Sequence, residues 1–102
     1  MSKVEAKRIV ERYAQKLRKN KMPFSSIYLF GSFSRGESRK NSDIDVAIVV
    51  RDKETDKMAG ELGFATIGID TRIEPHIFSE KDFEEVATPL IKEIIETGIK
   101  VE

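Results

Sequence analysis

The sequence has no cysteine and no excess of either charge, and each absence excludes a class of protein. Without cysteine there is neither a disulfide nor a thiolate metal site, which fits an intracellular protein, and we expect it in the cytoplasm. Lysine plus arginine equals aspartate plus glutamate at 18 each, so no net positive field is available to hold a long nucleic acid. Because the sequence shows neither an apolar signal core nor a run long enough to span a bilayer, we expect no membrane association.

The 102 residues predict one small domain, residues 1–102, in which helical and strand patterns alternate. The helical pattern at 53–65 is interrupted by Gly60 and Gly63, which lower helix stability. A mobile segment is the alternative interpretation of these residues. The expected fold is α/β (an α+β two-layer arrangement), with a small mixed sheet flanked by helices and covered mainly on one face. We expect helices at 3–20, 53–65, after Ser79 and from Pro89 to Gly98, and strands at 25–30, 43–50, around 70–79 and at 99–101.

A glycine-serine pair stands at the end of the first predicted strand. Gly31 lacks a Cβ atom, so the backbone can turn sharply there and present its amide N–H groups outward, where they suit phosphate oxygens. A short helix beginning near Ser32 would add donors and a partial positive charge at the same point. Arg35 would then reach a phosphate, and Arg39 and Lys40 extend the basic cluster. This segment is therefore predicted to bind phosphate groups.

Two aspartates, Asp43 and Asp45, open the second predicted strand. Side chains of a strand alternate between its faces, so both carboxylates are expected on the same side. Two like charges in one place repel each other, and a bound divalent cation removes that cost. Oxygen ligands near a triphosphate favour Mg²⁺, and a pair of such ions can hold the attacking and the leaving oxygen of a phosphoryl displacement. Because an aspartate within an apolar strand is costly to bury unpaired, Asp45 in particular indicates a functional site.

Together these residues resemble the signature of the minimal nucleotidyltransferases, a branch of the superfamily that includes DNA polymerase beta. That signature is Gly-Ser-x-x-Arg-Gly followed by Ser-Asp-Ile-Asp. The resemblance implies a nucleotidyltransferase fold and Mg²⁺-dependent transfer of AMP, or another nucleoside monophosphate, from ATP to a hydroxyl, with release of pyrophosphate. It assigns the metal ions to the two aspartates and the nucleotide phosphates to the other polar residues of the motif. The matching residues are Gly31, Ser32, Arg35, Gly36, Ser42, Asp43, Ile44 and Asp45.

Members of this superfamily carry a third carboxylate on a later strand, and Glu74 is the candidate here. Alternation places Arg72, Glu74, His76 and Phe78 on one face of the third strand, and the proline after Glu74 indicates an edge strand. Glu74 would complete the metal site or act as the base. The alternatives are a solvent-facing glutamate and, as third carboxylate, Asp70. A lone histidine has no second imidazole for a zinc site, so we expect His76 to lie part-exposed near the site.

The acceptor is not evident from the motif. Minimal nucleotidyltransferases resemble one another in often being encoded beside a helical HEPN-family protein. The two form a toxin–antitoxin pair, in which the transferase adenylylates a tyrosine of the toxin. The resemblance therefore implies an antitoxin role with a HEPN partner. Two alternatives stay open: a non-catalytic, nucleotide-binding antitoxin that acts by occlusion, and a small-molecule nucleotidyltransferase, which would work as a homodimer.

Overall fold

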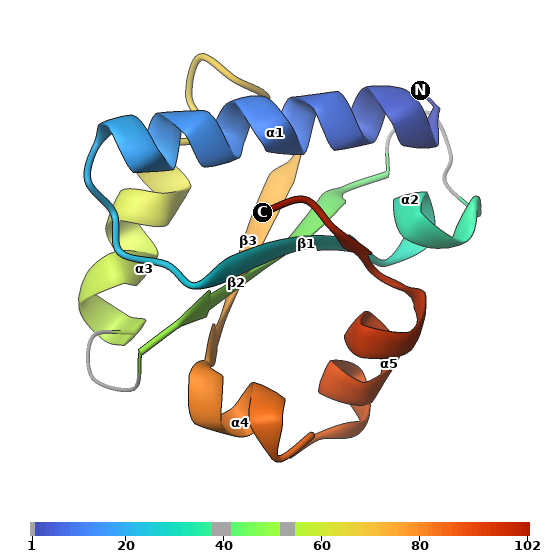
Figure 1. Cartoon of the computed structure of the whole chain (residues 1–102). Coiled ribbons are helices and arrows are strands. Elements are labelled where there is room, and N and C mark those ends of the chain that lie inside the picture. Colours follow the sequence, from blue (N-terminus) through green and yellow to red (C-terminus); the bar gives the residue numbers. More distant parts are fainter. Residues whose placement is uncertain (1, 38–41, 52–54) are drawn as a thin grey trace.

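The sheet at the centre of the molecule has four strands in the order β3-β2-β1-β4 (Figure 1). A computed structural model describes residues 2–37, 42–51 and 55–102. β1 is antiparallel to both β2 and β4, whereas β2 is parallel to β3, so the predicted mixed sheet is confirmed. The strands are β1 Ser26–Phe30, β2 Ile44–Val50, β3 Ile73–Ser79 and β4 Ile99–Lys100.

In the described ranges five helices accompany these strands, in the order that the sequence predicts. Three begin at a hydroxyl side chain that accepts a hydrogen bond from the first turn: Ser2 from the backbone N–H of Glu5, Ser79 from that of Asp82, and Thr88 from that of Ile91. Proline at the first position of the last helix has the backbone angle that a helix start needs. The helices are α1 Lys3–Lys19, α2 Ser32–Arg35, α3 Thr55–Phe64, α4 Glu80–Glu84 and α5 Pro89–Thr97.

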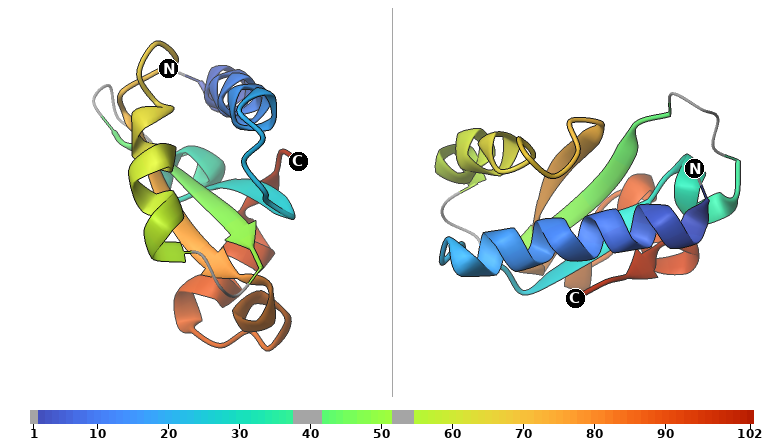
Figure 2. Two further views of the ribbon diagram at one scale, coloured as in Figure 1. Left: turned by 90° about the vertical axis from the view of Figure 1, so that its left-hand side faces the viewer. Right: turned by 90° about the horizontal axis from the view of Figure 1, so that it is seen from above.

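The helices divide into two groups with the sheet between them. The left view of Figure 2 shows α1 above the strands and α3 at their left, with α4 and α5 below them. The larger apolar cluster joins α1, α3 and one face of the sheet, which confirms that one face carries most of the cover. A smaller cluster, built on Phe30, Ala47 and Ile94, joins α5 to the opposite face. None of the helices in the described ranges combines the length and the apolar character needed to cross a membrane.

β2 is an inner strand whose side chains serve both faces. All of its residues are buried except Asp45, which is half-buried. β3 lies beside it at the edge of the sheet, as its proline predicts, and Pro75 pairs in register with Val46. The carboxylate of β2 is therefore placed next to an edge strand that also carries polar side chains.

Candidate functional site

The chain leaves β1 through a turn that only glycine can make at this place. Gly31 has a φ of +76°, and α2 begins at the next residue, Ser32, as predicted. A Cβ atom at Gly31 would overlap the Oδ2 carboxylate oxygen of Asp45. The backbone of the turn thus lies directly against that carboxylate, because residue 31 has no side chain.

Helix α2 is held in place by its own buried side chains. Phe33 is 1% exposed and packs into the larger cluster, while the Oγ of Ser34 donates a hydrogen bond of 2.9 Å to the Gly31 carbonyl. Gly36, with a φ of +73°, ends the helix in a left-handed conformation. The turn that the sequence predicts to bind phosphate is therefore held in place by the buried side chains of α2. Ser32, the first residue of this helix, is half-buried.

Three potential metal ligands meet on the face of the sheet that α4 and α5 cover. In the parallel pairing of β2 with β3, Asp45 lies opposite Glu74. The Nε2 atom of His76 is 3.3 Å from Asp45 Oδ1 and 3.8 Å from Glu74 Oε1. One ligand atom from each of these residues lies within 4.8 Å of the other two. Of the residues that the structure describes, these three form the group suited to bind a metal ion.

The imidazole of His76 is oriented by neighbours on two strands. Its hydrogen bond with Asp45 raises the pKa of His76 above the ordinary value; burial acts in the opposite direction, and the charges of Asp45 and Glu74 add to the rise. The ring of Phe30 on β1 packs edge-on against the imidazole, with 5.2 Å between ring centroids. The histidine thus presents Nε2 to the two carboxylates.

The structure brings some of the predicted site residues together and leaves others apart. Asp45 lies opposite Glu74, the candidate for the third carboxylate that the family resemblance implies. Asp43 is exposed just before β2 and lies outside the group of three ligands, and Ser42 is half-buried beside it. Asp70 is instead engaged by the guanidinium of Arg72 at 2.6 Å, and this hydrogen bonding lowers the pKa of Asp70. The two remaining basic residues of the predicted cluster, at positions 39 and 40, lie outside the described residues.

Arg35, the predicted phosphate ligand, contacts two carboxylates. Its Nε is 3.2 Å from Glu37, and one of its terminal nitrogens is 2.6 Å from Glu93 on α5. This places α5 at the edge of the site. A bound phosphate would therefore compete with these two glutamates for the guanidinium.

Two residues at the site were not predicted to take part in it. His76 was expected nearby, and its shared face with Glu74 was the available signal, but a lone histidine gave no reason to predict a ligand set. Glu93 stands 58 residues from Arg35 and has the sequence context of an ordinary helical glutamate. Only the packing of α5 against the sheet brings it to Arg35.

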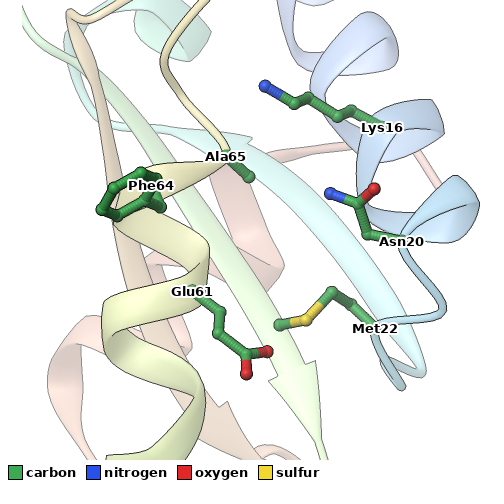
Figure 3. A pocket seen from close by; sticks show the side chains of 6 residues that line it. All are labelled: Lys16, Asn20, Met22, Glu61, Phe64 and Ala65. Carbon is green, nitrogen blue, oxygen red and sulfur yellow. The ribbon is translucent and has the colours of Figure 1, made fainter.

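A separate groove of about 410 Å³ lies between α1 and α3 (Figure 3). Its lining is mixed, with Met22, Phe64 and Ala65 beside the charged Lys16 and Glu61. These helices cover the face of the sheet opposite Asp45. The lining offers a single carboxylate, so it lacks the paired oxygen ligands that the Asp45 site has.

Sequence comparison identifies the family to which this geometry corresponds. The family model described as "Polymerase beta, Nucleotidyltransferase" matches residues 11–101. Protein adenylyltransferase MntA of Shewanella oneidensis is 50% identical over 36 residues, which are 35% of this chain and 26% of that protein. The match thus spans about a quarter of the length of this curated relative.

Solved structures agree with the fold. A toxin-antitoxin crystal structure with AMP-PNP is similar at a TM-score of 0.67 and 26% sequence identity, covering 90% of this chain and 72% of that one. The crystal structure of the toxin-antitoxin MntA-HepT is similar at a TM-score of 0.60 and 23% identity, covering 89% and 67%. At 23% identity, the similarity to the MntA-HepT structure shows a shared fold and nothing more. The arrangement of the sheet and helices is therefore shared with these solved structures.

Proposed function

Because the chain belongs to the polymerase beta nucleotidyltransferase family, we propose that it transfers AMP from ATP to a hydroxyl group with the help of Mg²⁺. One observation carries this proposal: the two oxygens of Asp45 face different parts of the site. Oδ2 lies against the turn at Gly31, whereas Oδ1 is 3.3 Å from Nε2 of His76, the atom that also approaches Glu74. A carboxylate placed in this way can serve a cation on the nucleotide side and another on the acceptor side.

The donor set fits Mg²⁺ on this chain's own chemistry. Asp45 and Glu74 supply carboxylate oxygens, and exposed Asp43, two residues before Asp45, adds a third carboxylate at the entrance. When bound, divalent cations would neutralise the triphosphate and lower the pKa of the acceptor hydroxyl. Glu74 completes the metal site or takes the proton that the hydroxyl loses.

The phosphate side of the site is supplied by the turn and by α2. The backbone at Gly31 and the hydroxyl of Ser32 hold the β- and γ-phosphates, and Ser42 stands at the entrance to β2, on the nucleotide side. Arg35 neutralises the charge of the leaving pyrophosphate, for which it must exchange Glu93 for a phosphate. The acceptor oxygen then bonds to the α-phosphorus, the bond to the bridging oxygen breaks, and pyrophosphate leaves.

We propose a tyrosine of a HEPN-type toxin as the acceptor, with this chain as the antitoxin. The similarity to a protein adenylyltransferase and to a toxin-antitoxin crystal structure with AMP-PNP supports this choice. AMP-PNP is an analogue of ATP, which supports ATP as the donor. We expect the partner to supply the surface around the acceptor tyrosine.

The proposal is tested by incubating the protein with Mg²⁺, ATP labelled at the α-phosphate and a candidate HEPN toxin. Label should appear on a toxin tyrosine, as located by mass spectrometry. Asp45→Asn should lower the rate by at least about 10³-fold, since several kcal/mol of charge stabilisation is lost. The matched control, Asp82→Asn at an exposed position of α4, should keep the full rate.

Two other outcomes would replace this proposal. ATP binding without any transferred label, together with toxin neutralisation by Asp45→Asn, would show a non-catalytic antitoxin that acts by occlusion. Label on a small molecule in the absence of any toxin would show a small-molecule nucleotidyltransferase.

A further inference from the structure

We propose that His76 is a nitrogen ligand of the cation on the acceptor side, which makes this site prefer transition-metal ions such as Mn²⁺ and Co²⁺ over Mg²⁺. The inference rests on the proposed function for the location of the acceptor, whereas the ligand set itself stands on the geometry of β2 and β3. It concerns a mixed set of one imidazole and two carboxylates.

The register of the two strands places the three ligands together. Asp45 pairs with Glu74, and two residues further along each strand Ala47 lies opposite His76. Residues paired in this way project to the same face, so the imidazole stands over a methyl group instead of a bulky side chain. Beside the small side chain of Ala47, the ring reaches Asp45 through Nε2 and packs edge-on against Phe30.

The separations are those of ligands around one ion. Metal–ligand bonds of 2.0–2.2 Å place neighbouring ligand atoms about 3.0 Å apart in an octahedron and about 3.4 Å apart in a tetrahedron. Nε2 of His76 lies 3.3 Å from Asp45 Oδ1 and 3.8 Å from Glu74 Oε1. Asp45 and His76 are half-buried and Glu74 is exposed, so shifts of a few tenths of an ångström in these side chains would bring all three atoms onto a single cation.

The two oxygens of Asp45 separate this ion from the one at the phosphates. Oδ1, the oxygen beside His76, faces away from Gly31, whose backbone lies against Oδ2. The cation at His76 and Glu74 is thus the one farther from the turn, on the side from which an acceptor hydroxyl must approach. The ion at the turn keeps an all-oxygen environment of phosphates and carboxylates, which suits Mg²⁺.

An imidazole ligand changes the preference of the acceptor-side ion. Nitrogen ligands favour first-row transition ions, and their affinity rises from Mn²⁺ through Co²⁺, whereas Mg²⁺ prefers oxygen and keeps its water. Removing the nitrogen should therefore weaken binding of Co²⁺ and Mn²⁺ and leave binding of Mg²⁺ nearly unchanged. A role of His76 in packing alone would affect all of these ions equally.

Electron spin echo envelope modulation of bound Mn²⁺ tests the nitrogen directly, in tag-free protein without nucleotide. The chain contains one histidine, so imidazole coupling to Mn²⁺ has a single source. We expect ¹⁴N modulation in the unmodified protein and its loss in His76→Gln. Displacement of Mn²⁺ should show that this variant binds Co²⁺ about 10-fold more weakly, with a change below about 2-fold for Mg²⁺.

Glu74→Gln provides the matched comparison, because the loss of a carboxylate should weaken both Co²⁺ and Mg²⁺. Thermal unfolding of each variant confirms that it is folded before the ions are compared. Absence of ¹⁴N modulation in the unmodified protein would overturn the inference, and so would an equal loss of Co²⁺ and Mg²⁺ affinity in His76→Gln. Since no nucleotide or acceptor is present, neither result depends on whether AMP transfer occurs.

Discussion

The two faces of the sheet share the same strands but differ in what they carry. On the side of α1 and α3, Ile44, Val46 and Ile48 of β2 are fully buried in one continuous apolar cluster. On the other side, the alternating positions of β2 begin with Asp45, followed by Ala47 and then Val49. This second face carries the three potential metal ligands beside a smaller apolar cluster to which α5 contributes Ile94.

The difference shows how a small domain accommodates both a core and a site. Because strand side chains alternate, one strand can supply stability from one face and a ligand from the other without lengthening the chain. The continuous cluster on the α1 and α3 side provides most of the apolar burial, so the opposite face can keep a carboxylate pair that costs stability. Substitutions on the two faces should therefore have separable effects on stability and activity.

The largest expected effect is the loss of stability when the apolar face is truncated. Ile48→Ala removes a fully buried side chain and leaves a cavity, which should lower the free energy of unfolding by about 3 kcal/mol. Chemical denaturation measures this change. The rate of AMP transfer per folded molecule should stay within about 2-fold, since Asp45 projects from the other face.

The matched control is Ile95→Ala on α5, where the side chain is 47% exposed. It should change the free energy of unfolding by less than about 0.5 kcal/mol. Equal losses of stability at positions 48 and 95 would contradict the assignment of the core to the α1 and α3 face.

The next effect should appear in activity. In Gly31→Ala the new Cβ would overlap Asp45 Oδ2. The alanine would also have to adopt the positive φ of this position, which alanine disfavours. The carboxylate must move by about 1 Å, for which we expect a rate loss of about 100-fold. A full transfer rate in a folded Gly31→Ala protein would show that the position of Asp45 does not matter.

The control for this substitution is Gly60→Ala in α3, where a Cβ meets no atom within 4 Å. Alanine has a better helix propensity, so this variant should gain up to about 1 kcal/mol of stability at an unchanged rate. The opposite signs of the two glycine substitutions separate a close backbone approach from an ordinary helical position.

The order of the helices and strands, and which side chains share a face of each strand, could be predicted from the sequence. Both follow from local properties: the spacing of apolar residues sets the elements, the alternation of strand side chains sets the faces, and Pro75 restricts β3 to an edge. The turn at Gly31 was predictable for the same reason, since it depends on one residue type at the end of an apolar run.

The ligand role inferred for His76 and the contact of Glu93 could not be predicted in this way. The position of His76 Nε2 between two carboxylates depends on the parallel register of β2 and β3, which a pattern of alternating residues does not determine. The contact between Glu93 and Arg35 depends on where α5 packs against the sheet. Both are tertiary properties, and both concern residues whose types are common on protein surfaces.

A smaller effect on stability is expected from a buried polar contact on the α1 and α3 side of the sheet. The hydroxyl of Tyr13 on α1 donates a hydrogen bond of 2.7 Å to the backbone carbonyl of Leu62 in α3. Tyr13→Phe leaves that carbonyl without its partner and should lower the free energy of unfolding by about 1–2 kcal/mol. Tyr28→Phe, on the opposite face against Phe83, is the control and should cost less. Equal costs would indicate that the bond between α1 and α3 contributes little.

The smallest effect concerns the turn that leads into β3. Asp70 accepts hydrogen bonds from the backbone N–H and the guanidinium of Arg72, which hold the pKa of Asp70 below its ordinary value. A carboxyl group with a lowered pKa in the folded state stabilises the protein above its unfolded pKa of about 4, and this contribution disappears as the pH falls through the folded pKa. Asp70→Asn should therefore cost about 1 kcal/mol near pH 7 and progressively less below pH 4.

Urea unfolding at a series of pH values measures this difference, with Glu84→Gln at an exposed position of α4 as the control for loss of a carboxyl charge. The control should show no comparable dependence. The same variants distinguish Asp70 from Glu74 as the third carboxylate of the site.

If Asp70 is structural, Asp70→Asn lowers stability and leaves the transfer rate unchanged. If Asp70 is instead the third carboxylate of the site, the substitution abolishes transfer, and Glu74→Gln should then retain activity.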